Sequence, residues 1–212
     1  MQSVHAFLLH GMGRTPLSMR WLAKRLQHFG MTTRLFGYFA GVERWDACRT
    51  RLVRRISAEI PLDAPYILIG HSLGTVLMRG ALPELSRPPL ACFLIAPPTV
   101  ACMLARKFAP HCWYSALNGD MGQRLADPAF MAALPIPEMP TRIYTGTRGI
   151  RGRFSPFGDE PNDGILKTSE TQLAGIAVRE IHATHTFIMR SEEIARDIVN
   201  AVIELQEKRE DK

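Results

Sequence analysis

The sequence of 212 residues lacks long apolar runs. None approaches the roughly 20 residues that a membrane-spanning helix needs, so no such helix is expected. The N-terminal segment has no basic stretch followed by a long apolar one, which argues against a signal peptide. Glycine and proline are scattered without a period, which excludes a fibrous repeat. We therefore expect a globular protein in the cytoplasm.

Cysteine is also sparse. Cys48, Cys92, Cys102 and Cys112 form no C-x-x-C pair and show no zinc-ligand spacing. Four cysteines in a chain of this length do not resemble the disulfide framework of a small secreted domain. We expect reduced thiols.

Basic residues exceed acidic ones, 26 to 20, so the net charge is +6. An excess of positive charge favours contact with nucleic acid, an anionic membrane or an acidic substrate. No nucleic-acid-binding motif accompanies it, so a nucleic-acid partner is not expected.

Short apolar runs alternate with longer amphipathic stretches, which indicates an α/β fold with a mostly parallel sheet and helices on both faces. No linker or internal repeat interrupts the pattern, so residues 1–212 are expected to form one domain. The expected strands are residues 4–9, 32–36, 66–69, 90–95, 141–145 and 177–181. The expected helices are residues 16–29, 45–60, 72–82 and 191–207. Thr15 is expected to cap the first helix, and Leu17 is assigned to its apolar face. The apolar face of the second helix is expected to carry Leu52, Val53, Ile56 and Ile60.

Two segments, residues 99–140 and 146–164, are too long for ordinary connections. The first is rich in Met and aromatic residues and is either a small lid or pocket wall, or a cover for the sheet. The second contains Arg148, Arg151 and Arg153. These arginines either bind an anionic substrate group or touch an anionic membrane surface weakly, or they belong to an ordinary solvated loop.

The strongest motif is Gly-His-Ser-Leu-Gly at residues 70–74. It matches G-x-S-x-G and lies between an apolar strand and a helical stretch, the setting that a nucleophile elbow needs. The two glycines suit a turn that leaves no room for side chains. Ser72 would then carry an exposed hydroxyl at the helix N-terminus and act as a nucleophile.

A second motif, His-Gly-Met-Gly at residues 10–13, follows the first strand. Acyl transfer needs donors for the developing oxyanion. The backbone N–H groups of Met12 and Leu73 are the candidates. His10 is expected to orient the loop rather than to act as a base.

With these motifs and an acid and a histidine near its end, the chain resembles small lipase- and esterase-like members of the α/β-hydrolase superfamily with a minimal cap or none. The resemblance covers nearly the whole chain and uses the order Ser, Asp, His. It implies a serine-hydrolase triad and an ester-like or lipid substrate. Because the chain reaches its first motif almost at once, it also implies a minimal fold of roughly six strands.

The acid of such a triad would follow the strand at residues 141–145, where the candidates are Asp159, Glu160 and Asp163. Asp163 is preferred because its Asn-Asp-Gly turn resembles the acid loop of small lipases. The base would follow the last strand, where His182 and His185 both qualify. His185 is preferred because family members place the base on the loop before the closing helix.

The resulting prediction is a serine hydrolase of carboxylic esters or lipids that needs neither a metal nor a cofactor. A thioesterase, an amidase or an acyltransferase would use the same triad and stays open. A non-catalytic binding protein on a hydrolase fold is the alternative of another class. The motifs do not assign a substrate-binding residue or an oligomeric state.

Overall fold

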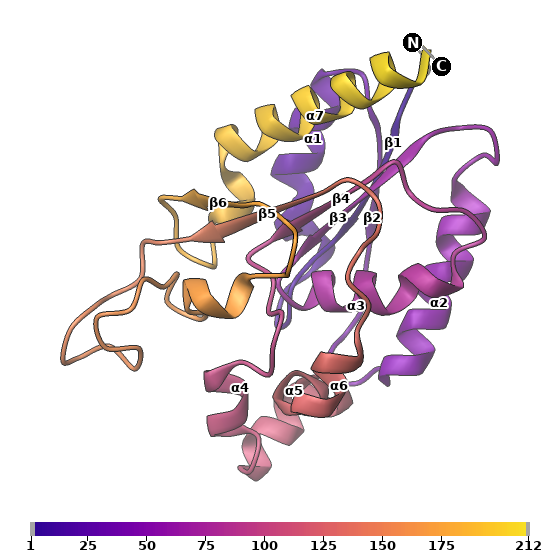
Figure 1. The fold of residues 1–212 in the computed structure, drawn as a ribbon. Helices are drawn as coiled ribbons and strands as arrows, with labels where there is room; N and C mark the ends of the chain where they lie inside the picture. The colour runs from indigo at the N-terminus through magenta and orange to yellow at the C-terminus, as the bar shows by residue number, and fades with distance from the viewer. Residues whose placement is uncertain (1–2, 211–212) are drawn as a thin grey trace.

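The computed structural model describes residues 3–210, which form a six-stranded sheet with all neighbouring strands parallel (Figure 1). The strand order is β2-β1-β3-β4-β5-β6. The strands are β1 (His5–Leu9), β2 (Thr32–Phe36), β3 (Tyr66–His71), β4 (Ala91–Ile95), β5 (Thr141–Gly146) and β6 (Val178–Ile181). The predicted fold class is confirmed. Residues 1–2 and 211–212 of the predicted domain lie outside the described residues. The first two also begin the segment that was predicted not to be a signal peptide.

Helices cover both faces of this sheet. The α-helices are α1 (Arg20–His28), α2 (Trp45–Glu59), α3 (Leu73–Ala81), α4 (Met103–Phe108), α5 (Cys112–Ala126), α6 (Pro128–Ala133) and α7 (Glu192–Glu210). Short 3₁₀ helices are η1 (Pro16–Met19), η2 (Leu82–Glu84), η3 (Thr168–Thr171) and η4 (Ile188–Arg190). Figure 1 shows α1 and α7 on one face and α2 and α3 on the other. Among residues 3–210, no helix is both long and apolar enough to cross a membrane.

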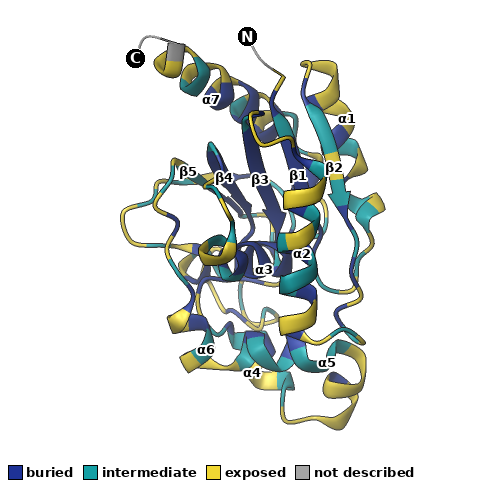
Figure 2. Ribbon diagram, turned by 90° about the vertical axis from the view of Figure 1, so that its right-hand side faces the viewer, coloured by how far each residue is buried: buried dark blue, intermediate teal, exposed yellow. Residues whose placement is uncertain are grey.

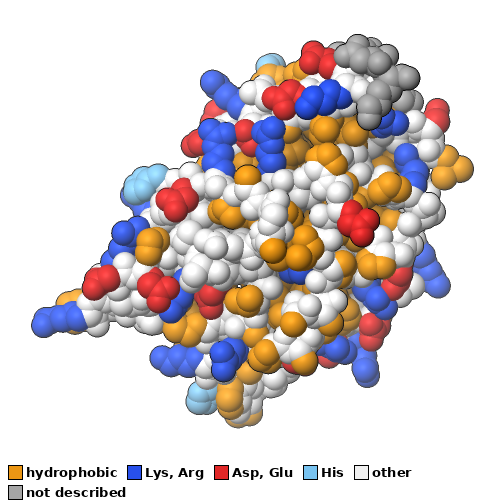
Figure 3. Space-filling model, viewed as in Figure 1, with side chains coloured by type: hydrophobic (Ala, Val, Ile, Leu, Met, Phe, Trp, Pro, Cys, Tyr) orange, Lys and Arg blue, Asp and Glu red, His pale blue; other side chains and the backbone are white. Residues whose placement is uncertain are grey.

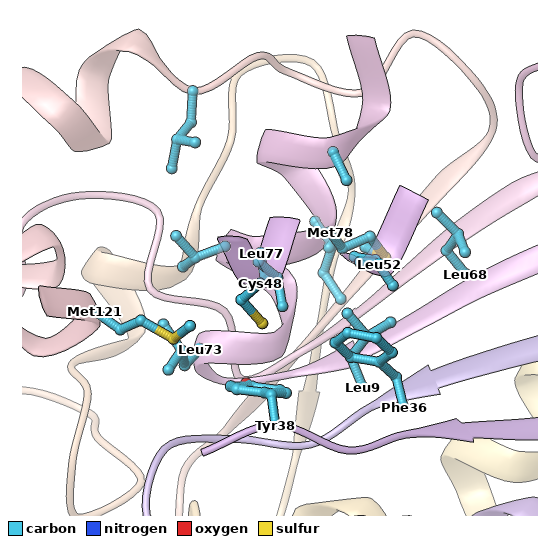
Figure 4. Packing of buried hydrophobic residues seen from close by; sticks show 14 of the residues in the cluster. Leu9, Phe36, Tyr38, Cys48, Leu52, Leu68, Leu73, Leu77, Met78 and Met121 are labelled. Carbon is cyan, nitrogen blue, oxygen red and sulfur yellow. The ribbon is translucent and has the colours of Figure 1, made fainter. Parts of the chain in front are cut away.

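Successive strand residues point to opposite faces, so each strand feeds two apolar clusters. Phe7 and Leu9 of β1 pack with α2 and α3, whereas Ala6 and Leu8 pack with α1 and α7. Figure 2 shows the central strands as fully buried, and Figure 4 shows side chains of the first cluster meeting between the sheet and α2 and α3. Burial on both faces explains why these strands read as continuous apolar runs.

The helix expected at residues 16–29 begins differently from the prediction. Its first turn is the 3₁₀ helix η1, and the α-helix starts at Arg20. The Thr15 side chain, expected as a cap, makes no capping hydrogen bond, and Pro16 has no N–H to donate. Leu17, assigned to the apolar face, is 68% exposed.

Charged side chains are dispersed over the face seen in Figure 3, where blue and red groups are interspersed along the top and right edges. Many form surface ion pairs, for example Arg179 with Glu193 and Arg51 with Glu43. The positive net charge therefore does not gather into one continuous basic patch on this face.

The carboxyl ends of parallel strands lie along one edge of a sheet, where sites form in open α/β folds. Both predicted motifs and both long segments leave strands at this edge. The fold therefore collects at one place segments that are more than 100 residues apart in the sequence.

Candidate active site

Ser72 occupies the sharp turn between β3 and α3. Its backbone has φ 51° and ψ −123°, a conformation that L-residues rarely adopt. Such strain costs on the order of 1–3 kcal/mol and persists only where the surroundings enforce it. The Ser72 N–H donates to the carbonyl of Ile95 (2.9 Å), and its own carbonyl accepts from the Thr75 hydroxyl (2.7 Å). The turn is thus tied to β4 and to the first turn of α3.

The turn leaves no space for a side chain at either glycine of the Gly-His-Ser-Leu-Gly motif. A Cβ at Gly70 would lie 2.7 Å from the Thr75 nitrogen. One at Gly74 would lie 2.6 Å from the carbonyl oxygens of Leu9 and His10. Helix α3 therefore packs backbone to backbone against the end of β1, which brings the two sequence motifs together.

His185 lies on the loop between β6 and α7 and contacts the turn. Its Nε2 is 2.9 Å from Ser72 Oγ, and its Nδ1 is 2.7 Å from Asp163 Oδ2. A neutral ring that donates Nδ1–H to the carboxylate leaves Nε2 as the acceptor for the serine hydroxyl. His182, the alternative from the sequence, is exposed.

Asp163 is held in place from several directions. Its side chain is buried, and Oδ1 accepts the N–H groups of Ile165 (2.9 Å) and Leu166 (2.7 Å). Its carbonyl accepts the N–H of His185 (2.9 Å), so the loops that carry Asp163 and His185 are also joined through the backbone. Asp159 and Glu160 are exposed, and neither contacts His185. The structure therefore brings together the preferred three residues and neither alternative.

His71, next to Ser72, contacts the backbone of His185. It is buried, and its Nε2–H donates to the carbonyl of His185 (3.0 Å), while no described residue bonds its Nδ1. Burial, followed by the nearby His185 ring, lowers the pKa of His71 well below its ordinary value of 6.5. The ring therefore stays neutral and keeps its donor on the His185 carbonyl.

This burial predicts sensitivity to acid. Below pH 6.5 the unfolded chain protonates His71 whereas the folded chain does not, so stability is present above that pH and is lost as the pH falls. The slope from this one group reaches about 1.4 kcal/mol per pH unit. Urea unfolding at pH 7.5, 6.5 and 5.5 should show a shallower loss for His71→Gln than for the wild type. The exposed control His28→Gln should keep the wild-type slope, and equal slopes for all three proteins would contradict the prediction.

His10, which is expected to orient the first loop, contacts that loop and a residue that the sequence analysis missed. The Tyr38 hydroxyl donates to the His10 carbonyl (2.6 Å), and the two rings stack with centroids 4.3 Å apart. His10 Nδ1 lies 2.8 Å from the Gly11 carbonyl. Burial lowers the pKa of His10, so the neutral ring is favoured. Tyr38 lies after β2, and no local pattern connects it to the motif.

A cavity of about 370 Å³ opens beside Ser72 and His185. Met12 lines it from the first loop, and Leu73, the first residue of α3, lies directly after the serine. The N–H groups of a first helical turn have no partner inside the helix. Residues 99–140 supply much of the apolar wall, including Leu104, Phe108 and Tyr114.

The same segment also covers the core. Met121 and Met131 are buried in the cluster that contains α3, whereas Trp113 and Leu117 are 48% and 69% exposed. Some residues of the segment thus line the cavity, as a lid or pocket wall would, and others pack against the core, as a cover for the sheet would. Its role as a lid or pocket wall of a single domain remains a prediction.

Two buried charged residues that the sequence analysis missed hold the segment. Glu170 accepts the N–H of Met103 (2.5 Å) at the start of α4. The Arg79 guanidinium donates to the carbonyls of Leu134 and Pro135, 2.9 Å each, after α6. Arg79, the one charged residue of the buried helix α3, was the available signal for the second contact.

No family model and no curated protein matches this sequence. Solved structures do resemble it. A mature lipase from Bacillus licheniformis superposes with a TM-score of 0.71 at 15% identity, covering 93% of this chain and 92% of the lipase. A metagenomic carboxyl esterase gives 0.68 at 16% identity, covering 99% of this chain and 77% of the esterase. A hydrolase from Oleispira antarctica gives 0.62 at 12% identity, covering 96% and 92%. At these identities the likeness concerns the fold.

Proposed function

We propose that this chain, which has the α/β-hydrolase fold in a minimal six-stranded form, is a serine hydrolase of carboxylic esters. A fold of this kind hosts many functions, so the proposal depends on the site. The observation that carries it is the continuous hydrogen-bonded series from Ser72 Oγ through His185 to Asp163.

In the proposed mechanism, His185 Nε2 takes the hydroxyl proton as Ser72 Oγ attacks the ester carbonyl carbon. Asp163 keeps the proton on Nδ1 and stabilises the imidazolium that forms. The N–H groups of Met12 and Leu73 would stabilise the oxyanion, and the loss of one such donor typically costs about 3–4 kcal/mol.

The tetrahedral intermediate then collapses as the bond to the leaving alkoxide oxygen breaks. His185 returns its proton to that oxygen, so an alcohol leaves and Ser72 carries the acyl group. Water adds to the acyl-enzyme while His185 again takes a proton. Collapse of this second intermediate breaks the bond to Ser72 Oγ, which regains its proton, and releases a carboxylic acid.

The apolar wall of the cavity supports a substrate with a hydrocarbon acyl chain. Two of the similar structures are a lipase and a carboxyl esterase, which is in keeping with ester or lipid substrates. The strained backbone of Ser72 also supports the proposal, since strain of this size tends to be kept where function requires it.

Labelling with a fluorophosphonate probe tests the proposal. Mass spectrometry should find the adduct on Ser72 and find none in Ser72→Ala. Removing the base in His185→Ala should slow labelling by about 10²–10⁴-fold, the usual range for general-base assistance. His182→Ala, with an exposed histidine on the same loop, should label at the wild-type rate. Folded wild-type protein that stays unlabelled with and without detergent would refute the proposal.

A further inference from the structure

Arg14 distinguishes this cavity from a purely apolar pocket. It directly follows the His-Gly-Met-Gly loop, and it lines the cavity together with Met12 and Ser72. Within residues 3–210, no Asp or Glu lines this cavity, and Arg14 is its one Lys or Arg. The cavity thus combines a long apolar wall with a single permanent positive charge near the serine.

The charge of Arg14 has no acidic partner among the described side chains. Across the part of the chain that the structure describes, the Arg14 side chain makes no ion pair and no hydrogen bond, although it is only partly exposed. Other arginines, such as Arg51 and Arg142, pair with carboxylates. A guanidinium has five N–H donors in a planar fork that fits a carboxylate or a phosphate. Its donors are therefore available to an anion that enters the cavity.

The charge of Arg14 also acts on the turn that carries Ser72. It is among the charges that lower the pKa of His71, the residue before Ser72. Gly13, with φ 64°, turns the chain between Met12 and Arg14. One short loop thus presents both the proposed oxyanion donor and the arginine at the same cavity.

We infer that Arg14 binds an anionic group of the substrate, and that the preferred substrates are esters with an apolar acyl chain and a carboxylate or phosphate close to the ester bond. This inference rests on the proposed hydrolase function and narrows its substrate class. A charge-assisted, bidentate pair holds such an anion more strongly than a neutral group of the same size. The apolar wall would hold the acyl chain.

The arginines that the sequence analysis considered for this role lie elsewhere. Arg148, Arg151 and Arg153 are exposed, and none lines the cavity. Arg153 stacks on the ring of Phe154, with 4.5 Å between the guanidinium carbon and the ring centroid. They therefore do not supply an anion-binding group to this cavity, and their weak contact with an anionic membrane stays a prediction.

Three esters of one acyl chain test the inference: 1-hexanoylglycerol, 1-hexanoylglycerol 3-phosphate and O-hexanoylglycolate. All release hexanoate, so kcat/KM is measured in the same way for each. Wild-type protein should prefer at least one anionic ester over the neutral one by about tenfold or more, since a charged hydrogen bond contributes at least ~1.5 kcal/mol. The better of the two anionic esters tells whether phosphate or carboxylate is the source of the charge.

Arg14→Gln should reduce the ratio of kcat/KM for the anionic ester to that for the neutral ester about tenfold or more, and Arg14→Lys should lose less of it. Arg20→Gln, which removes an exposed arginine outside the cavity, should keep the wild-type ratio. Raising NaCl to 0.5 M should lower the ratio of the wild type, a readout that needs no variant.

Failure of the inference about Arg14 can be distinguished from failure of the proposed hydrolase function. Wild-type protein that cleaves the neutral ester without preferring either anion, or Arg14→Gln that keeps the preference, would overturn the inference and leave the proposed hydrolase standing. Folded wild-type protein that cleaves none of the three esters and does not label on Ser72 would overturn both.

Discussion

Ser72→Ala is expected to lower kcat for a short p-nitrophenyl ester by about 10⁴–10⁶-fold, to the residual rate that binding and oxyanion donors alone supply. The reason is that Ser72 Oγ is the atom within hydrogen-bonding distance of His185 Nε2, so its removal leaves no group to carry the acyl chain. Ser57→Ala, a change of an exposed serine on α2, is the matched control and should keep wild-type activity. More than 1% residual activity in Ser72→Ala would exclude Ser72 as the nucleophile.

Ser72→Gly extends this test to the strained turn. Both variants lack the hydroxyl, but only glycine adopts a positive φ without strain from a Cβ. Relief of about 1–3 kcal/mol of strain, less the 0.5–1 kcal/mol by which glycine favours the unfolded chain, should leave Ser72→Gly about 1 kcal/mol more stable than Ser72→Ala. Urea unfolding measures this difference. A Ser72→Gly that is no more stable than Ser72→Ala would mean that the side-chain strain at φ 51° is no larger than the roughly 0.5–1 kcal/mol by which glycine favours the unfolded chain.

Asp163→Asn is expected to lower kcat by about 10⁴-fold while changing KM little, the size of effect seen when a triad histidine is held in the wrong tautomer. The aspartate has two oxygens, and both accept: Oδ1 from the N–H groups of Ile165 and Leu166, and Oδ2 from His185. Asparagine has one oxygen, which the two backbone donors retain. Its NH₂ group then faces Nδ1 and favours the tautomer that carries its proton on Nε2, which cannot accept the serine proton.

Asp159→Asn is the control, because it makes the same chemical change at an exposed position of the same loop. It should keep wild-type kcat. A loss of less than tenfold in Asp163→Asn, or an equal loss in both variants, would contradict the assignment of the acid. Circular dichroism of each variant establishes that the fold is kept.

The fold was predictable because its signals are local. The central strands β1, β3 and β4 are short apolar runs, and the turn at Ser72 has the glycines that its crowded backbone requires. Helical periodicity also predicted correctly which side of α2 faces the apolar core along most of its length. They failed at Leu17, because η1 rotates that side chain into solvent and the helical periodicity starts only at Arg20.

The site was predictable where a motif carries it, and less so where contacts join distant segments. Choosing Asp163 over Asp159 from the residues alone would require knowing which carboxylate the loop turns inward, and the resemblance to lipases supplied that preference. Tyr38 and Glu170 act through contacts with residues 28 and 67 positions away. No periodicity encodes such pairs, since they arise only when the sheet order places the segments together.

The order of strands has a consequence for the chain while it is being made. The serine follows β3, near the middle of the sheet, whereas the proposed acid and base follow β5 and β6, which are synthesised later than β3 and β4. A nascent chain that has completed β4 already holds the elbow, but it has no residue 163 or 185 to activate the hydroxyl. Under the proposed mechanism, the ability to cleave esters is therefore gained only after residue 185 has been synthesised and its loop has folded, so a growing chain that holds only the elbow stays chemically inert.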